Sequence, residues 1–195
     1  DVYKRQDLYS ALNSPAMVRR WNAALDDATL IQDLGGQSAV WHVRYAPAWL
    51  AQARDATLVQ TAYQSPTSIH VFSFSADEHM SELPTPAPGT VRMQVDLCGW
   101  SIEALSPTTV HVTLVEQSDP RGWLSKTRTP PQMIVAMAGA GEHVLRHGAP
   151  PCISRLFNAR MQTQAYGEDS FDVSYVAAAC DAPCLLYTSD AADER

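Results

Sequence analysis

The side chains in this sequence that most resemble a reactive arrangement are His143 and His147, which directly follow Glu142. Histidines four residues apart share one face of a helix and could hold a zinc ion. In the helical zinc-protease motif, however, the glutamate follows the first histidine, whereas here it precedes it. No third ligand is evident. The pattern therefore favours a positively charged last turn of a helix, and we predict no metal site.

Other catalytic patterns are weaker. Gly139-Ala-Gly141 lacks the third glycine of a dinucleotide-binding loop and falls inside an expected helix. The sequence contains neither a G-x-S-x-G elbow nor a Walker loop. We predict no catalytic residues and no cofactor. An enzyme would need a polar group aimed into an interior cavity, and the candidates for that group are His42, His70 and His111.

The composition is that of a globular protein with an acidic surface. The chain has 195 residues, of which 46% are hydrophobic and 18% are charged, and its net charge is −7. Length alone allows one domain, or one domain and a fragment of another. The acidic balance disfavours a nucleic-acid partner, which would require a basic face. The longest apolar run, residues 133–141, is too short to span a membrane.

Both ends of the sequence look like translated DNA from library preparation. Asp1–Gln6 and the segment beginning at Cys184 can be read from opposite strands of one transposon adapter. We expect residues 1–6 and 184–195 to be adapter artefacts, and the gene to be truncated at both ends. Without the adapters three cysteines remain, an odd number that suits reduced thiols in the cytosol.

Most of the chain shows the pattern of antiparallel strands. Apolar and polar residues alternate at 39–45, 68–71, 91–97 and 110–114, and a further strand is expected at 57–63. Alternation with one apolar face is typical of antiparallel strands that are covered on one side. No long helix is expected between residues 55 and 128, so the sequence excludes a parallel sheet built from strand–helix–strand units.

Helices are expected at the beginning and after the strands. Short helical segments are predicted at 7–14 and 16–23, and a longer helix from Pro130 to His147, with Gly148 directly after its C-cap. The proline-rich segment 76–89 reads as a long loop. Residues 149–183 begin as a linker and resume a strand-like pattern, so we expect the opening of a truncated second β-rich domain there.

An ordered set of short motifs resembles the START (StAR-related lipid-transfer) domain over about residues 8–148. The motifs are Arg20-Trp21, Ala53-Arg54-Asp55, Val91-Arg92, Gly99-Trp100, Thr109–Thr113 and Gln117–Leu124. The resemblance implies that residues 7–148 form a partial START-like domain. Its fold would be α+β and of the helix-grip type, with a curved antiparallel sheet packed on the C-terminal helix. The family's N-terminal helix and first strands have no counterpart in this sequence.

The resemblance also implies a site. In the family, the sheet and the C-terminal helix enclose a tunnel for one lipid, and that helix and a neighbouring loop form its gate; here these would be residues 131–147 and 76–89. Gln60 falls about where some members bury a base. The implied lining residues share an inward position on a strand or on the helix: Trp41, Val43, Val91, Met93, Val95, Val110, Val112, Leu114, Met133 and Met137.

The resemblance therefore implies a cytosolic, non-catalytic domain that binds a lipid and transfers it during transient contact with a membrane surface. Two alternatives remain open. The chain could be a lipid-independent interaction or regulatory module of a multidomain protein, or an enzyme on a START-like scaffold that uses one of the three histidines named above. For the pair Arg54 and Asp55 we prefer a structural role, the anchoring of a loop to the sheet.

Overall fold

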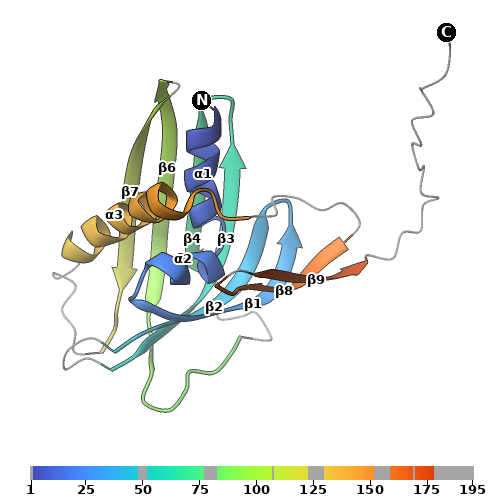
Figure 1. The fold of residues 1–195 in the computed structure, drawn as a ribbon. Helices are drawn as coiled ribbons and strands as arrows, with labels where there is room; N and C mark the ends of the chain where they lie inside the picture. The colour runs from blue at the N-terminus through green and yellow to red at the C-terminus, as the bar shows by residue number, and fades with distance from the viewer. Residues whose placement is uncertain are drawn as a thin grey trace, which may run out of the picture.

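The computed structural model describes most of the chain (Figure 1). The described residues are 2–47, 52–76, 83–106, 108–122, 130–151, 159–168 and 170–177. Within the first and last helices, the described side chains begin at Arg5 and at Val135.

The elements alternate little between helix and strand, since two helices come first, then a run of strands, then a third helix and a hairpin. In chain order they are α1 (Val2–Leu12), α2 (Pro15–Trp21), β1 (Leu25–Gly35), β2 (Ser38–Tyr45), β3 (Arg54–Gln64), β4 (Ser68–Ser75), β5 (Val91–Arg92), β6 (Gln94–Ser106), β7 (Thr109–Asp119), α3 (Pro130–His147), β8 (Ala159–Tyr166) and β9 (Phe171–Ala177).

The main sheet has the strand order β1-β2-β3-β4-β6-β7, and every neighbouring pair in this path is antiparallel. The short strand β5 adds to β3 in parallel. Strands β8 and β9 form a separate two-stranded sheet. The predicted α+β class with an antiparallel sheet is therefore confirmed, and β1 and β7 are the two edge strands of the sheet.

Strand β1 is the one element of the main sheet that the sequence analysis did not predict. Three aspartates fall within it, and aspartate is depleted in strands. The structure gives each of them a partner: Arg44 binds Asp26 at 2.8 Å, Arg19 lies 3.6 Å from Asp27, and Asp33 accepts a 2.8 Å hydrogen bond from the Gly35 backbone. Register shifts between β1 and β2 also break the alternation that would have revealed the strand.

Helices α2 and α3 begin and end close to where their sequences predict, whereas α1 runs from Val2 to Leu12 instead of the predicted 7–14 and so begins inside the segment expected to be an adapter artefact. Ser14 is the N-cap of α2 and accepts a hydrogen bond from Met17 N at 3.3 Å, while Pro15 occupies the first turn. Helix α3 runs from Pro130 to His147 as predicted. Gly148 follows it with φ of 77° and donates to Val144 O at 2.9 Å. Glycine adopts this left-handed conformation without a steric penalty.

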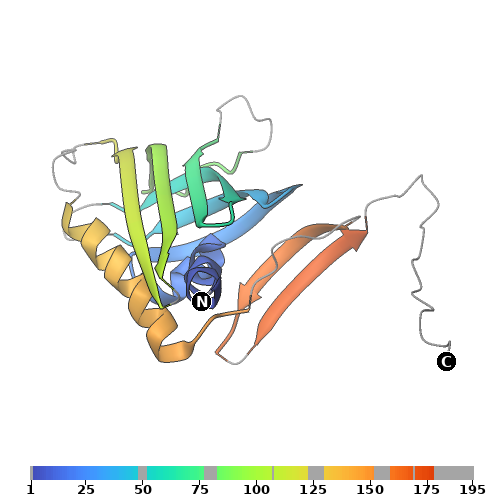
Figure 2. The same ribbon diagram turned by 90° about the horizontal axis from the view of Figure 1, so that it is seen from above.

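The interior consists of two apolar clusters on the concave side of the sheet. The helical cluster joins α1 and α3 to β4 and β6, and its buried members are Leu8, Tyr9, Leu12, Ile69, Val71, Ile102 and Ala140. The strand cluster lies mainly between β1, β2 and β3, and its buried members are Leu25, Trp41, Val43, Ala56, Leu58 and Val95. Figure 2 shows α1 in the hollow of the curved sheet and α3 beside it.

The β8–β9 hairpin packs against β1 and α2 rather than standing apart. Met161 N donates to Asp33 Oδ2 at 2.8 Å, and Arg20 Nη1 donates to Tyr166 O at 3.4 Å. The guanidinium of Arg160 lies so close to Gly35 that a Cβ at that glycine would meet Arg160 Nη1. The hairpin therefore covers part of the β1 edge. The opening of a second domain in this region stays a prediction.

Candidate functional site

The predicted lipid-lining residues divide between the two clusters. Trp41, Val43 and Val95 are fully buried members of the strand cluster, and Met93 packs against it. Val110 and Val112 instead pack against the helical cluster as partly buried residues. The structure therefore brings the first group together on one half of the sheet and places the second group on the other half.

The remaining predicted residues are less enclosed. Val91 in β5, Leu114 in β7 and Met137 in α3 are half-buried. Met133 lies in α3, but its side chain is outside the described residues. Along β7 the inward row is half-buried and the outward row is exposed at every position from Thr109 to Gln117. This half of the concave face is thus apolar but incompletely covered.

Helix α3 contacts α1 and α2 and buries little of its own length. Ala140 is its buried residue among the described side chains, whereas Val135 is 68% exposed and Leu145 is 79% exposed. At Gly139 a Cβ would lie 3.2 Å from the Trp21 ring and 3.4 Å from Trp21 O. The absence of a side chain at Gly139 therefore sets how closely α3 approaches α2.

A buried ionic cluster lies at the start of β3, where sequence analysis predicted a loop anchor. Asp55 is 1% exposed and receives two hydrogen bonds from Arg92, at 2.9 Å from Nε and 2.8 Å from Nη2. His42 Nε2 lies 3.0 Å from Asp55 Oδ2. Arg92 also donates to Pro84 O at 2.6 Å. Asp55 thus holds the described part of the proline-rich loop to the sheet.

Electrostatics explains why this carboxylate remains charged. Burial alone would raise the pKa of Asp55, but hydrogen bonds and positive charge from Arg92 and His42 outweigh it and lower the pKa below its ordinary value. Its neighbour Arg54 does not share these partners. Its Nε donates to Pro120 O at 3.3 Å and its Nη2 to Arg121 O at 3.3 Å, so Arg54 fastens the turn after β7. The predicted anchoring role is confirmed, and each residue anchors a different loop.

The three histidines proposed as catalytic groups lie on the face opposite the two clusters. His42 alternates with Trp41 and Val43 along β2, and both of those residues point into the strand cluster. His70 and His111 likewise occupy the positions between inward residues of β4 and β7. The enzyme alternative required one of these imidazoles to face the interior, so this geometry gives it no support.

The predicted helical histidine pair lies at the C-terminal end of α3. The His143 and His147 rings lie 4.9 Å apart in the last turns of α3, beside a 3.0 Å ion pair between Arg146 and Glu142. Burial, followed by the charges of His147 and Arg20, lowers the pKa of His143. Among the described residues, no three or more histidine, cysteine, aspartate or glutamate side chains gather in a way that could hold a metal ion.

Gln60, which the resemblance placed near the position of a buried base, holds the connection between the first two helices. Its amide Nε2 donates to Leu12 O at 3.1 Å and to Asn13 O at 2.9 Å. Both acceptors are backbone carbonyls at the C-terminal end of α1, which an amide donor satisfies. The amide nitrogen of Gln60 therefore has a structural role, because it holds the connection between α1 and α2.

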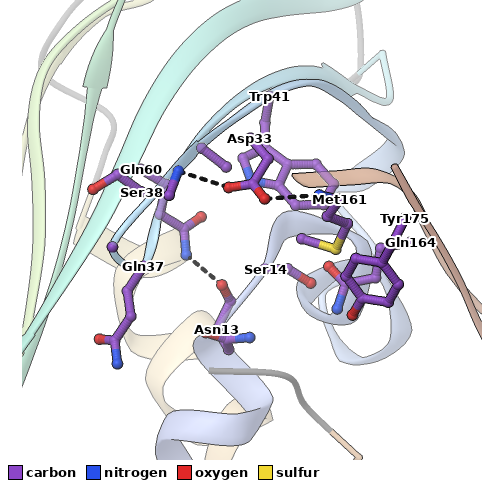
Figure 3. A pocket seen from close by; sticks show the side chains of 13 residues that line it. Asn13, Ser14, Asp33, Gln37, Ser38, Trp41, Gln60, Met161, Gln164 and Tyr175 are labelled. Atoms are coloured by element: carbon purple, nitrogen blue, oxygen red, sulfur yellow. Dashed lines mark hydrogen bonds between the residues drawn. The ribbon is translucent and has the colours of Figure 1, made fainter. Parts of the chain in front are cut away.

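A polar pocket of about 70 Å³ lies beside Gln60, between the β1–β2 turn, the α1–α2 connection and the β8–β9 hairpin (Figure 3). Its principal polar lining residues are Asn13, Asp33, Gln37, Gln60, Gln164 and Tyr175, and Trp41 and Met161 contribute apolar surface. A second cavity of about 50 Å³ lies beside Arg92 and Met93. Each is much smaller than the several hundred Å³ of a typical ligand pocket. Sequence analysis missed the polar pocket because residues more than a hundred positions apart form it.

No helix in the part of the chain that the structure describes is both long enough and apolar enough to cross a membrane.

Comparison with solved structures gives the same architecture. Human STARD10 aligns with a TM-score of 0.61 and 18% identity over 73% of this chain and 62% of its own. Human StAR-related lipid transfer protein 5 aligns with a TM-score of 0.64 and 18% identity, over 72% and 69%. A STAR-related lipid transfer protein from Xanthomonas axonopodis gives 0.56 and 15%, over 71% and 78%.

At these identities the structures establish the fold, and the chain spans less than two thirds of STARD10. A search of curated proteins finds no match. The model of the START domain family, however, matches residues 6–136, which is most of the chain. These residues include most of α1, all of α2, the whole main sheet and the beginning of α3. The chain therefore belongs to the START domain family.

Proposed function

We propose that this domain binds one lipid between the β6–β7 half of its sheet and helix α3, and transfers that lipid between membranes without catalysis. The family supports lipid binding in general. The observation that carries the specific proposal is the half-buried apolar row Val110, Val112 and Leu114, which faces the helical cluster without being enclosed by it. An acyl chain laid against this row would remove apolar surface from water, which contributes about 25 cal/mol per Å².

Entry of a lipid requires α3 to move, because neither of the two cavities described above is large enough to hold one. The helix is suited to this movement. It lies against Trp21 of α2 at a glycine, Gly139, and it has exposed apolar side chains near both ends of its described part, Val135 and Leu145. These side chains would meet the membrane during transfer.

The test is lipid analysis of the purified chain together with a filling substitution. Mass spectrometry of an organic extract should show bound lipid, and vesicle-to-vesicle transfer of a fluorescent lipid should be accelerated by the protein. Leu114→Trp adds bulk on the inward row and should lower both signals severalfold. Val115→Trp adds the same side chain on the outward face of the same strand and is the matched control. Wild-type protein with neither bound lipid nor transfer would refute the proposal.

A lipid-independent interaction module is the second candidate, and one surface favours it. The outward face of β3, β4, β6 and β7 exposes large apolar side chains: Tyr63, Phe72, Phe74, Leu97 and Val115. The rings of Tyr63, His70 and Phe72 are stacked along it, with centroids 6.4 Å and 6.1 Å apart. Exposed apolar patches of this kind mark protein interfaces. A protein captured by wild type, but not by a Phe72→Ser, Phe74→Ser variant that still transfers lipid, would support this module.

A further inference from the structure

The polar pocket of Figure 3 joins two parts of the chain that the family match separates. The START-matched part contributes Asn13, Asp33, Gln37, Trp41 and Gln60, while the hairpin beyond residue 136 contributes Met161, Gln164 and Tyr175. A pocket built by two segments is completed only when the hairpin is docked. Whatever binds there would also hold the hairpin against β1.

Two buried oxygen atoms at this pocket lack hydrogen-bond partners. Gln164 is 8% exposed, and its amide nitrogen donates to Tyr166 Oη at 3.0 Å while its carbonyl Oε1 has no donor. The hydroxyl of Tyr175 is buried and also has no partner among the described residues. Buried polar atoms are nearly always paired in folded proteins, by protein, water or ligand. Both side chains border the cavity, so an occupant of the cavity is the natural partner.

Asp33 gives the pocket a negative charge, and among the described residues no cationic side chain forms an ion pair with it. Asp33 lines it, and each of its carboxylate oxygens accepts one backbone hydrogen bond, from Gly35 N and from Met161 N, both at 2.8 Å. A carboxylate oxygen can accept a second hydrogen bond. No lysine, arginine or histidine is among the described residues that line the pocket. Arg160 lies over Gly35, but within the described residues it forms no ion pair with Asp33.

The apolar part of the lining restricts the occupant further. The indole of Trp41 and the ring of Tyr175 border the same space as Asp33. Aromatic faces attract cations, and the attraction strengthens where water is excluded. The proximity of Asp33 to Tyr175 is reflected in the tyrosine, whose pKa is raised first by burial and then by that carboxylate. A positively charged group with several N–H donors therefore complements the lining better than a neutral polyol or an anion does.

We propose that this pocket binds a primary ammonium group carried by a small molecule of the amino-alcohol class, with Asp33, Gln164 Oε1 and the Tyr175 hydroxyl as its acceptors. The volume of about 70 Å³ admits only a few non-hydrogen atoms. For so small a ligand, a dissociation constant on the order of 1 mM is expected. The group could belong to a free amine or to a lipid headgroup.

Ethanolamine is the probe, titrated into delipidated full-length protein and followed by ¹⁵N–¹H NMR. The amides of Gly35 and Met161, which donate to Asp33, should shift saturably. Glycerol, a polyol without charge, should bind at least about tenfold more weakly, since it lacks the charge-assisted bonds. No saturable shift with ethanolamine, or equal binding of glycerol, would overturn the proposal.

Tyr175→Phe supplies the decisive variant, because it removes only a hydroxyl that has no hydrogen-bond partner among the described residues. The melting temperature should stay the same, while ethanolamine binds about fivefold more weakly, as expected for one lost hydrogen bond. Tyr63→Phe, at an exposed tyrosine on the outward face, is the matched control and should bind as wild type does. Unchanged affinity in Tyr175→Phe would overturn the assignment.

A second experiment distinguishes a free amine from a lipid headgroup as the source of the ammonium group. Vesicles of phosphatidylcholine with and without phosphatidylethanolamine are added to wild type and to Tyr175→Phe. A shift of the Gly35 and Met161 amides that requires phosphatidylethanolamine and weakens in Tyr175→Phe would assign the group to a lipid headgroup. A response to free ethanolamine but not to these vesicles would assign it to a soluble amine. If neither probe shifts these amides, the pocket does not bind ammonium groups.

Discussion

The two halves of the sheet are built from similar side chains but packed to different degrees. In the β1–β3 half, both faces of β3 are covered at its beginning, where Arg54 to Leu58 are all buried. In the β6–β7 half, no residue of β7 is fully buried. The first half also carries the Asp55 cluster, whereas the second rests against helices that contact it through few residues. Rigid anchoring and incomplete enclosure thus occur in the same sheet, and the proposed lipid site lies in the incompletely enclosed half.

The largest effect that would test this contrast is expected at Asp55. Asp55→Ala leaves the Arg92 guanidinium without its carboxylate in a half-buried site. Removing one partner of a buried pair typically costs about 3–5 kcal/mol. Urea unfolding should show this loss in the free energy of unfolding. Asp26→Ala, which breaks the exposed pair with Arg44, is the control and should cost less than about 1 kcal/mol. Similar losses in the two variants would contradict the assignment of Asp55 as the buried anchor of the β1–β3 half.

Alanine substitution of an inward side chain should lower the free energy of unfolding more in the β1–β3 half than in the β6–β7 half. Trp41→Ala empties a fully buried position in the strand cluster and should cost about 3–5 kcal/mol. Val112→Ala removes two methyl groups from a half-buried position and should cost about 1 kcal/mol or less. The free energies of unfolding from urea titration would measure both. A loss at Val112 that approached the loss at Trp41 would mean that the second half is packed as firmly as the first.

Acidification should remove the stabilisation that Asp55 contributes to the β1–β3 half of the sheet. Because the folded pKa of Asp55 lies below its ordinary value of 3.8, the unfolded chain takes up a proton at this site before the folded chain does. The stabilisation is therefore complete above about that pH and declines as the pH falls through the lower, folded pKa. Urea unfolding of wild type between pH 5 and pH 2.5 should show a steeper decline than in Asp55→Asn, which has no proton to bind there. Parallel declines would contradict the assignment.

The smallest effect concerns the two glycines within α3. Gly141→Ala meets no atom within 4 Å and should stabilise the helix by up to about 1 kcal/mol. Gly139→Ala would place its methyl group 3.2 Å from the Trp21 ring, so this gain should be reduced or reversed. Thermal unfolding of both variants gives the comparison. An equal gain at both sites would show that α3 does not rest on Trp21.

Sequence patterns were sufficient for much of this fold. The alternation in β2, β4, β6 and β7 and the proline and glycine limits of α3 are local features, and each was predicted correctly. Strand β1 was not predicted, because its aspartates are stabilised by distant partners such as Arg44. For the same reason the pattern identified Arg54 and Asp55 as anchors but not Arg92 or His42 as the partners of Asp55. Partners separated by thirteen or more positions meet only once the strands have paired.

The candidate site was harder to predict from the sequence than the fold was. Alternation identified which residues point inward, but it did not separate Trp41 in a filled cluster from Val112 beside a partly open one. That difference depends on where α3 rests, which Gly139 and Trp21 decide through a contact between distant segments. The polar pocket could not be foreseen either, since it needs the docked hairpin.

The unequal edges of the sheet bear on how the protein behaves at high concentration. The hairpin shields part of the β1 edge, and Asp26 and Asp27 add charge to it. Strand β7, at the other edge of the described sheet, is 11 residues long, alternates in polarity and contains no lysine or proline. Such an edge is a template for self-association into extended sheets. Precipitation on storage should therefore start there, and a lysine in place of Val115, whose side chain is 52% exposed, should delay it.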